Sequence, residues 1–138
     1  MAVKFKAGRY YVGDLCYVMN RDEWDELLEL SGDFGDKLGS DQWFGYFKGF
    51  QVFAAFTADG DGVYFDNEGR EYVVDDGLIG IISADWVEGK EEEIVGLGHI
   101  IAFPVDFRVS ADGGFFEFGE IVINTDVEEE DELEEEDE

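Results

Sequence analysis

The chain is poor in the residues that crosslink a protein, ligate zinc or interrupt a strand: its 138 residues include one cysteine, one histidine and one proline. The lone Cys16 excludes an internal disulfide and fits a reducing compartment. One cysteine and one histidine are also too few for a zinc site. No stretch approaches the roughly 18 apolar residues that span a bilayer, and no apolar run typical of a signal peptide follows the basic N-terminus. We therefore expect a cytoplasmic protein with no disulfide, membrane span or cofactor.

Basic residues are scarce as well, with nine Lys and Arg against 36 Asp and Glu, a net charge of -27. Residues 126–138 contain 11 of these carboxylates, so 25 acids and all nine bases belong to the rest of the chain. Such a field repels nucleic acid and attracts basic surfaces. The commonest basic surfaces in a cell are those that hold DNA or RNA. The charge predicts a partner that handles nucleic acid, with carboxylates standing where phosphates would, and no direct binding of nucleic acid or membrane.

Adaptation to high salt is the competing explanation of the charge, because salt screens repulsion. Halophilic surfaces avoid lysine, whereas this chain has five lysines and four arginines. Thirteen phenylalanines are also more apolar bulk than that explanation favours. We rank it second.

The apolar content indicates a folded body, since 45% of residues are hydrophobic and 16% are aromatic. The length fits one domain, which we place at residues 1–125. Residues 126–138 are too charged to pack, and we expect a disordered acidic tail there. The tail is either a solubilising extension or a flexible polyanion that reaches a basic partner early.

One amphipathic helix is predicted at residues 21–30. Asn20 and Glu23 form a capping box, and Met19 with Trp24 fits a hydrophobic staple. Gly32 supplies a stop signal. Residues 83–86 and 90–95 are candidates for single helical turns.

The rest of the chain favours strands, because short segments rich in aromatic and β-branched residues alternate with Gly- and Asp-rich turns. Two short segments within residues 9–18, broken at Gly13-Asp14, are followed by strands at 43–48, 51–57, 62–66, 71–74, 78–83, 99–109 and 115–124. Pro104 places the strand 99–109 at an edge or a bulge, and Gly119 indicates a further bulge. The fold class is mainly β (α+β): an antiparallel sandwich or a partly open barrel with one amphipathic helix.

Several segments resemble a set of small, largely uncharacterised bacteriophage proteins: GRYYVGDLCYV (8–18), FTADGDGVY (56–64), DNEGR (66–70), VDDGLIGI (74–81) and FGEIVINT (118–125). The resemblance implies a phage origin and no agreed activity. By charge and size alone, the chain is similar to the phage DNA-mimic inhibitors that disarm restriction enzymes, nucleases and CRISPR effectors.

The turns around residues 59–71 suggest an alternative role, an accessory domain with a calcium or small-ligand site. Oxygen ligands at Asp59, Asp61, Asp66 and Glu68 could surround a hard cation. The segment fails the EF-hand pattern, because Val63 and Tyr64 stand where a ligand and a glycine are required. Two hairpin turns explain the same residues more simply.

No residue set predicts catalysis. Cys16 and His99 are single residues of their types within apolar strand patterns, which favours packing over a nucleophile–base pair. Pairs of carboxylates arise by chance among 36 acids, and the glycines form no phosphate-binding loop. We therefore expect a protein that is not an enzyme.

The sequence favours a phage-encoded acidic inhibitor, a DNA mimic that binds and blocks a host nucleic-acid-binding defence protein. A rigid mimic needs charges at fixed spacing, so we look for its binding face on the helix and on neighbouring turns. The predicted partner-binding residues are Asp22, Asp25, Glu26, Glu29, Asp59, Asp61, Asp66, Glu68, Asp75 and Asp76.

Overall fold

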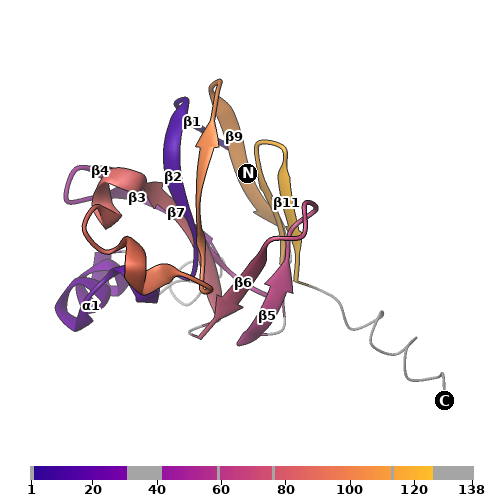
Figure 1. Ribbon diagram of the computed structural model, residues 1–138. Helices are drawn as coiled ribbons and strands as arrows, with labels where there is room; N and C mark the ends of the chain where they lie inside the picture. Colours follow the sequence, from indigo (N-terminus) through magenta and orange to yellow (C-terminus); the bar gives the residue numbers. More distant parts are fainter. Residues whose placement is uncertain (1, 31–41, 59, 76, 113, 126–138) are drawn as a thin grey trace, which may run out of the picture.

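The computed structural model describes residues 2–30, 42–58, 60–75, 77–112 and 114–125, and within them the chain is mainly antiparallel β-structure (Figure 1). A four-stranded sheet has the order β1 (Ala2–Phe5), β9 (Phe107–Asp112), β10 (Phe115–Phe118), β11 (Ile121–Asn124). A five-stranded sheet has the order β3 (Gln42–Phe47), β4 (Phe50–Phe56), β7 (Leu78–Ser83), β2 (Gly8–Gly13), β8 (His99–Phe103). The hairpin β5 (Gly62–Phe65) and β6 (Glu71–Val74) forms a third sheet. The mainly β fold class with one helix is confirmed.

The five-stranded sheet is buried on both faces, which explains why its strands are apolar without alternation. Every residue of β7 from Leu78 to Ile82 is buried. One face packs against the four-stranded sheet and the β5–β6 hairpin in a first core that includes Phe53, Ile81 and Phe116. The other face packs in a second core against helical segments. These segments are η1 (Leu15–Val18), α1 (Arg21–Leu30), η2 (Ala84–Val87) and η3 (Glu91–Ile94).

Helix α1 begins and ends where the sequence predicts. The capping box is confirmed: the Glu23 N–H donates to Asn20 Oδ1 at 2.8 Å, and the Asn20 N–H donates to Glu23 Oε1 at 2.9 Å. Gly32, the predicted stop, lies outside the described residues. The predicted helical turn at residues 83–86 is present as η2, and the Ser83 side chain caps it by accepting the Asp85 N–H.

Two predicted strands are wrong in part. Residues 15–18 form the 3-10 helix η1, because the Asp14 carboxylate accepts the Cys16 N–H at 3.0 Å and curls the chain. The predicted strand 99–109 is two strands in different sheets, β8 and β9, separated by a bend at residues 104–106. Pro104 has no N–H to continue the ladder, and Val105 in the bend is 67% exposed.

Two further details differ from the sequence prediction. The predicted strand 115–124 is a hairpin of two antiparallel strands, β10 and β11, and Gly119, expected at a bulge, lies in the tight turn between them with φ of 64°. Strand β1 was not predicted. It pairs with β9, and Val3 and Phe5 enter the first core. The acidic tail lies outside the described residues.

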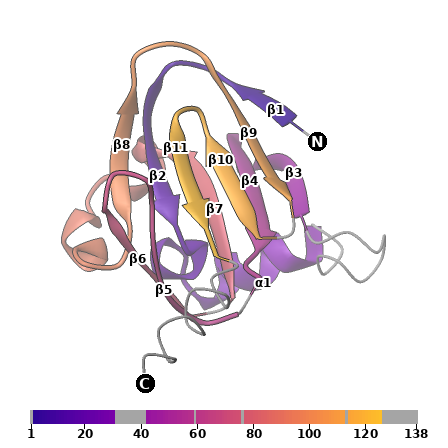
Figure 2. The same cartoon turned by 90° about the vertical axis from the view of Figure 1, so that its right-hand side faces the viewer.

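The β5–β6 hairpin joins the edges of the two larger sheets. In the turn of the hairpin, the Asn67 N–H donates to the Val122 carbonyl oxygen of β11 at 2.9 Å. In β6, the Val73 N–H donates at 2.9 Å to the carbonyl oxygen of Leu97, two residues before β8. Figure 2 shows the hairpin beside β8 and β11. The described residues contain no helix long and apolar enough to cross a membrane.

Candidate functional site

Helix α1 separates its acidic residues from its apolar residues. Asp22, Asp25, Glu26 and Glu29 recur at intervals of three and four, so their Cβ atoms stand about 5–6 Å apart along one face. All four side chains are exposed. Leu27 points to the other side and is fully buried in the second core. The helix therefore anchors a row of carboxylates on a packed support.

A second group of acids lies on η2, η3 and the turn between them, where the sequence reasoning named no site residue. Its members are exposed: Asp85, Glu88, Glu91, Glu92 and Glu93. Val87 and Ile94 from the same segment are buried in the second core, on the face of the sheet that α1 also covers. The run of three glutamates was visible in the sequence, but its place beside α1 depends on the fold.

The two acidic segments are tied together at the carbonyl of Val18, three residues before α1. Trp86 Nε1 donates to this oxygen at 2.8 Å, and Lys90 Nζ donates to it at 3.1 Å. The Lys90 ammonium also lies 5.3 Å from the centroid of the Trp86 ring, a cation–π geometry. Lys90, the only lysine of the η2–η3 segment, therefore connects this segment to the residues just before α1.

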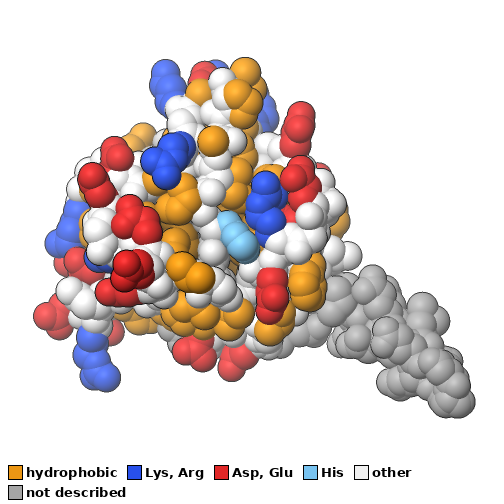
Figure 3. Space-filling view, in the orientation of Figure 1, with side chains coloured by type: hydrophobic (Ala, Val, Ile, Leu, Met, Phe, Trp, Pro, Cys, Tyr) orange, Lys and Arg blue, Asp and Glu red, His pale blue; other side chains and the backbone are white. Residues whose placement is uncertain are grey.

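We name the combined surface the acidic helical face, and Figure 3 shows acidic side chains gathered over this part of the molecule. Its members are Asp22, Glu23, Asp25, Glu26, Glu29, Asp85, Glu88, Glu91, Glu92 and Glu93. Three basic residues accompany it: Arg21, Lys90 and Lys48, of which Lys48 pairs with Glu26 at 3.2 Å. The surface keeps a large excess of negative charge.

The outer face of the four-stranded sheet is different. Lys4 and Arg108 lie opposite each other in the β1–β9 register and are both exposed. Asp112 and Glu117 stand on the neighbouring strands β9 and β10. The acids of the described residues are therefore not spread uniformly, since this face balances its charges and the acidic helical face does not.

The structure brings some of the predicted turn acids to the acidic helical face. Asp75 lines a shallow hollow together with Asp25 and Arg21, at the start of α1. Asp61 lies at the same end of the β5–β6 hairpin, where Gly60 approaches Gly77. Glu68 lies at the opposite end of the hairpin. Asp59 and Asp76 fall outside the described residues.

Asp66 is not available to a partner, because its side chain is fully buried. Its Oδ1 accepts the N–H groups of Glu68 and Arg70 at 2.8 and 2.9 Å, and its Oδ2 accepts from Arg70 Nη1 at 3.0 Å and the Tyr72 hydroxyl at 2.8 Å. Burial opposes ionisation, but these four hydrogen bonds outweigh it and hold the pKa of Asp66 below its ordinary value. Burial and this carboxylate raise the pKa of Tyr72. The Asp66 carboxylate therefore stabilises the turn between β5 and β6.

The proposed calcium ligands do not converge. Asp61 precedes β5 and Glu68 follows it, and a four-residue strand spans ~13 Å, whereas calcium ligands lie about 2.3–2.6 Å from the ion. Asp66 is committed to its four donors. Among the residues that the structure describes, no group of three or more His, Cys, Asp or Glu is placed to hold a metal ion.

Cys16 and His99 take separate structural positions. Cys16 is half-buried in η1, and its N–H is bonded to the Asp14 cap. His99 Nε2 lies 2.8 Å from the Glu71 carbonyl oxygen, and its ring packs edge-on against Tyr72 with centroids 5.0 Å apart. His99 therefore links β8 to β6.

Comparison with known proteins gives no family for this fold: no family model, curated protein or solved structure matches the chain.

Proposed function

We propose that the protein is a phage-encoded inhibitor that binds a basic, nucleic-acid-binding host defence protein and excludes its DNA or RNA. The observation that carries the proposal is the acidic helical face. Ten acidic residues from two chain segments stand on one side of the five-stranded sheet, with three basic residues among them. The resemblance to small phage proteins supports the origin, and the partner class follows from the charge.

The support beneath the carboxylates suits a mimic. A flexible polyanion loses conformational entropy when it binds, whereas charges held on packed elements lose less. Leu27, Val87 and Ile94 anchor the segments in one core, and the bonds of Trp86 and Lys90 to Val18 hold them together. A basic groove shaped for phosphates would meet this face without reordering it.

The test is displacement of fluorescent duplex DNA from two enzymes, a guide-loaded Cas9-type nuclease and a type II restriction endonuclease. We expect the protein to displace DNA from at least one of them and to lose affinity steeply between low and moderate salt. A triple variant, Asp22→Asn, Asp25→Asn and Glu29→Gln, leaves the capping box and the Glu26–Lys48 pair intact. With about 0.5–1 kcal/mol for each exposed ion pair, the variant should bind about 10- to 100-fold more weakly.

The matched control removes three charges elsewhere, through Glu71→Gln, Asp112→Asn and Glu117→Gln. Its net charge equals that of the helix variant, so any difference reports the position of the charges. The proposal is wrong if neither enzyme releases DNA, or if both triple variants weaken binding equally.

A further inference from the structure

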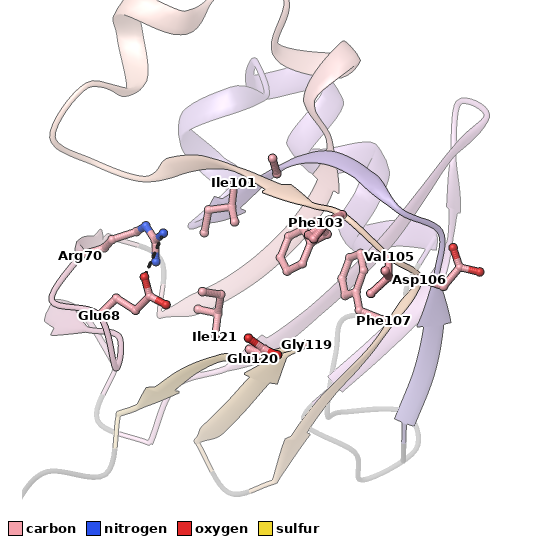
Figure 4. Close-up of a pocket in the computed structure, with 12 residues that line it drawn as sticks. Glu68, Arg70, Ile101, Phe103, Val105, Asp106, Phe107, Gly119, Glu120 and Ile121 are labelled. Atoms are coloured by element: carbon pink, nitrogen blue, oxygen red, sulfur yellow. Dashed lines mark ion pairs between the residues drawn. The ribbon is translucent and has the colours of Figure 1, made fainter.

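A cleft of about 400 Å³ opens between the edges of the two larger sheets, on the side away from the helical segments. One wall comes from β8, β9 and the bend between them, and the other from the β10–β11 turn and the start of β11. The turn of the β5–β6 hairpin closes one end. Figure 4 shows Phe103 and Phe107 on one wall, Gly119 and Ile121 on the other, and Arg70 at the end. Its size falls within the range of small-ligand sites.

The first wall is apolar, and its two phenylalanines belong to the first core, each with 7% of its surface exposed. The rings of Phe103 and Phe107 are stacked, with centroids 3.9 Å apart and planes at 12°. Ile101 extends this wall along β8, and Ile121 faces it from β11. Gly119 closes the cleft against this pair, because a Cβ there would lie 3.2 Å from Phe107 Cβ and 3.4 Å from the Phe103 ring. The apolar space of the cleft therefore lies between Ile101 and Ile121, beside the phenylalanine pair (Figure 4).

The rim is acidic, and its geometry is fixed by Asn67. The Asn67 side chain donates to the Glu120 carbonyl oxygen at 3.0 Å and accepts the Val122 N–H at 3.0 Å. These bonds hold the hairpin turn that carries Glu68 against the turn that carries Glu120. Both glutamate side chains are exposed at the rim of the same cleft.

The cleft has one basic residue, Arg70, and its charge is already matched. Nη1 lies 3.0 Å from Asp66 Oδ2, and Nη2 lies 3.4 Å from Glu68 Oε1. Glu120 and Asp106 are further carboxylates of the lining. An anionic ligand would meet a net negative rim, whereas a cation would be attracted to it.

From this geometry we propose a second binding site: the cleft takes a small organic cation, whose apolar ring enters between Ile101 and Ile121 beside the Phe103–Phe107 pair and whose ammonium group lies at the acidic rim with Glu120 and Glu68. The site is distinct from the acidic helical face and does not rest on the proposed inhibitor function. Its chemistry combines an apolar cleft with acidic groups at the rim.

The experiment compares three compounds with one ring and different head groups: 2-phenylethylamine, 2-phenylethanol and 3-phenylpropionate. Binding to the full chain is followed by NMR shifts of the Phe103 and Phe107 ring protons in 150 mM salt. We expect the amine to bind with a Kd of about 1 mM, the alcohol more weakly and the carboxylate weakest. Glu120→Gln should weaken the amine about 2- to 5-fold and leave the alcohol unchanged.

Glu117→Gln is the control, because it removes the same charge from β10 outside the cleft and should change the affinity for the amine by less than about twofold. Three results would overturn the site: no ring-proton shift with the amine up to about 10 mM, carboxylate binding as tight as amine binding, or equal effects of Glu117→Gln and Glu120→Gln.

Discussion

The buried carboxylate of Asp66 gives the sharpest stability prediction. The Asp66→Asn variant keeps the side-chain volume and the oxygen that accepts the N–H groups of Glu68 and Arg70. It replaces Oδ2, the acceptor of Arg70 Nη1 and the Tyr72 hydroxyl, by an amide nitrogen. Two hydrogen bonds to a charged acceptor are therefore lost, one of them from a tyrosine that is fully buried.

Hydrogen bonds to charged groups contribute about 1.5–3 kcal/mol each. The hydrogen bond from Arg70 contributes less than this, because the Arg70 side chain is 31% exposed and water can replace the lost acceptor. We therefore expect a loss of about 2 kcal/mol in the free energy of unfolding. An unfolding entropy of about 2.1 cal/mol/K per residue gives about 250 cal/mol/K for a body of roughly 120 residues, so the midpoint should fall by about 8 °C.

The pH dependence gives an independent check. The pKa of Asp66 is lowered in the folded state, so its carboxylate stabilises the fold fully above the unfolded value near 3.8, and this contribution is lost as the pH falls through the folded pKa. The difference in midpoint between wild type and variant should be constant from about pH 5 to 8 and shrink below about pH 4. Thermal melts followed by circular dichroism measure both values. Equal midpoints at pH 7, or a difference that persists unchanged to pH 3, would refute the reasoning.

Three further predictions concern the helix, the central sheet and the charge. Asn20→Ala removes the α1 cap and should cost about 1 kcal/mol, seen as a drop of about 4 °C in the melting midpoint; an unchanged midpoint would mean that the cap contributes nothing. Gly80→Ala places a Cβ 2.8 Å from Leu15 Cδ1 and from the Phe53 carbonyl oxygen, and should lower the free energy of unfolding in urea by about 1–3 kcal/mol. The control is Gly49→Ala, because the space around its Cβ is open and its φ is 90°. This variant should lose only about 1 kcal/mol, through backbone strain. Raising NaCl from 50 mM to 1 M should raise the melting midpoint, because salt screens the repulsion within a chain of net charge -27, and a falling midpoint would contradict that account.

The features that the sequence predicted best are those encoded locally. The capping box at Asn20 and Glu23 fixes the start of α1 within four residues, and the Gly-containing turns separate most strands where the pattern indicated. The bend at Pro104 was misjudged because the alternation of Ile101, Phe103, Phe107 and Val109 continues across it. Both strands bury their apolar residues in the same first core, from different sheets.

The candidate sites were less predictable because they depend on contacts between distant segments. The side chain of Asp66 looks like any other turn acid until Tyr72 and Arg70 are seen to enclose it. The acids of η2 and η3 join those of α1 only through Val18 and the shared core. The cleft requires edges of two sheets to face each other, and no local pattern in β8 or β11 indicates that arrangement.

Strand β7 has apolar residues on both of its faces, so polarity alone does not fix its register with the neighbouring strands. In a sheet with one buried face, a one-residue slip would bury polar side chains, and the free-energy cost of that burial fixes the register of neighbouring strands. Here a slip would exchange Ile79 and Ile81 for Leu78, Gly80 and Ile82, so the buried stretch of the strand would stay apolar on both faces. Shape distinguishes the two registers: a Cβ at the position of Gly80 would lie 2.8 Å from Leu15 Cδ1, so a slip that brought Ile79 or Ile81 to this position would clash with Leu15.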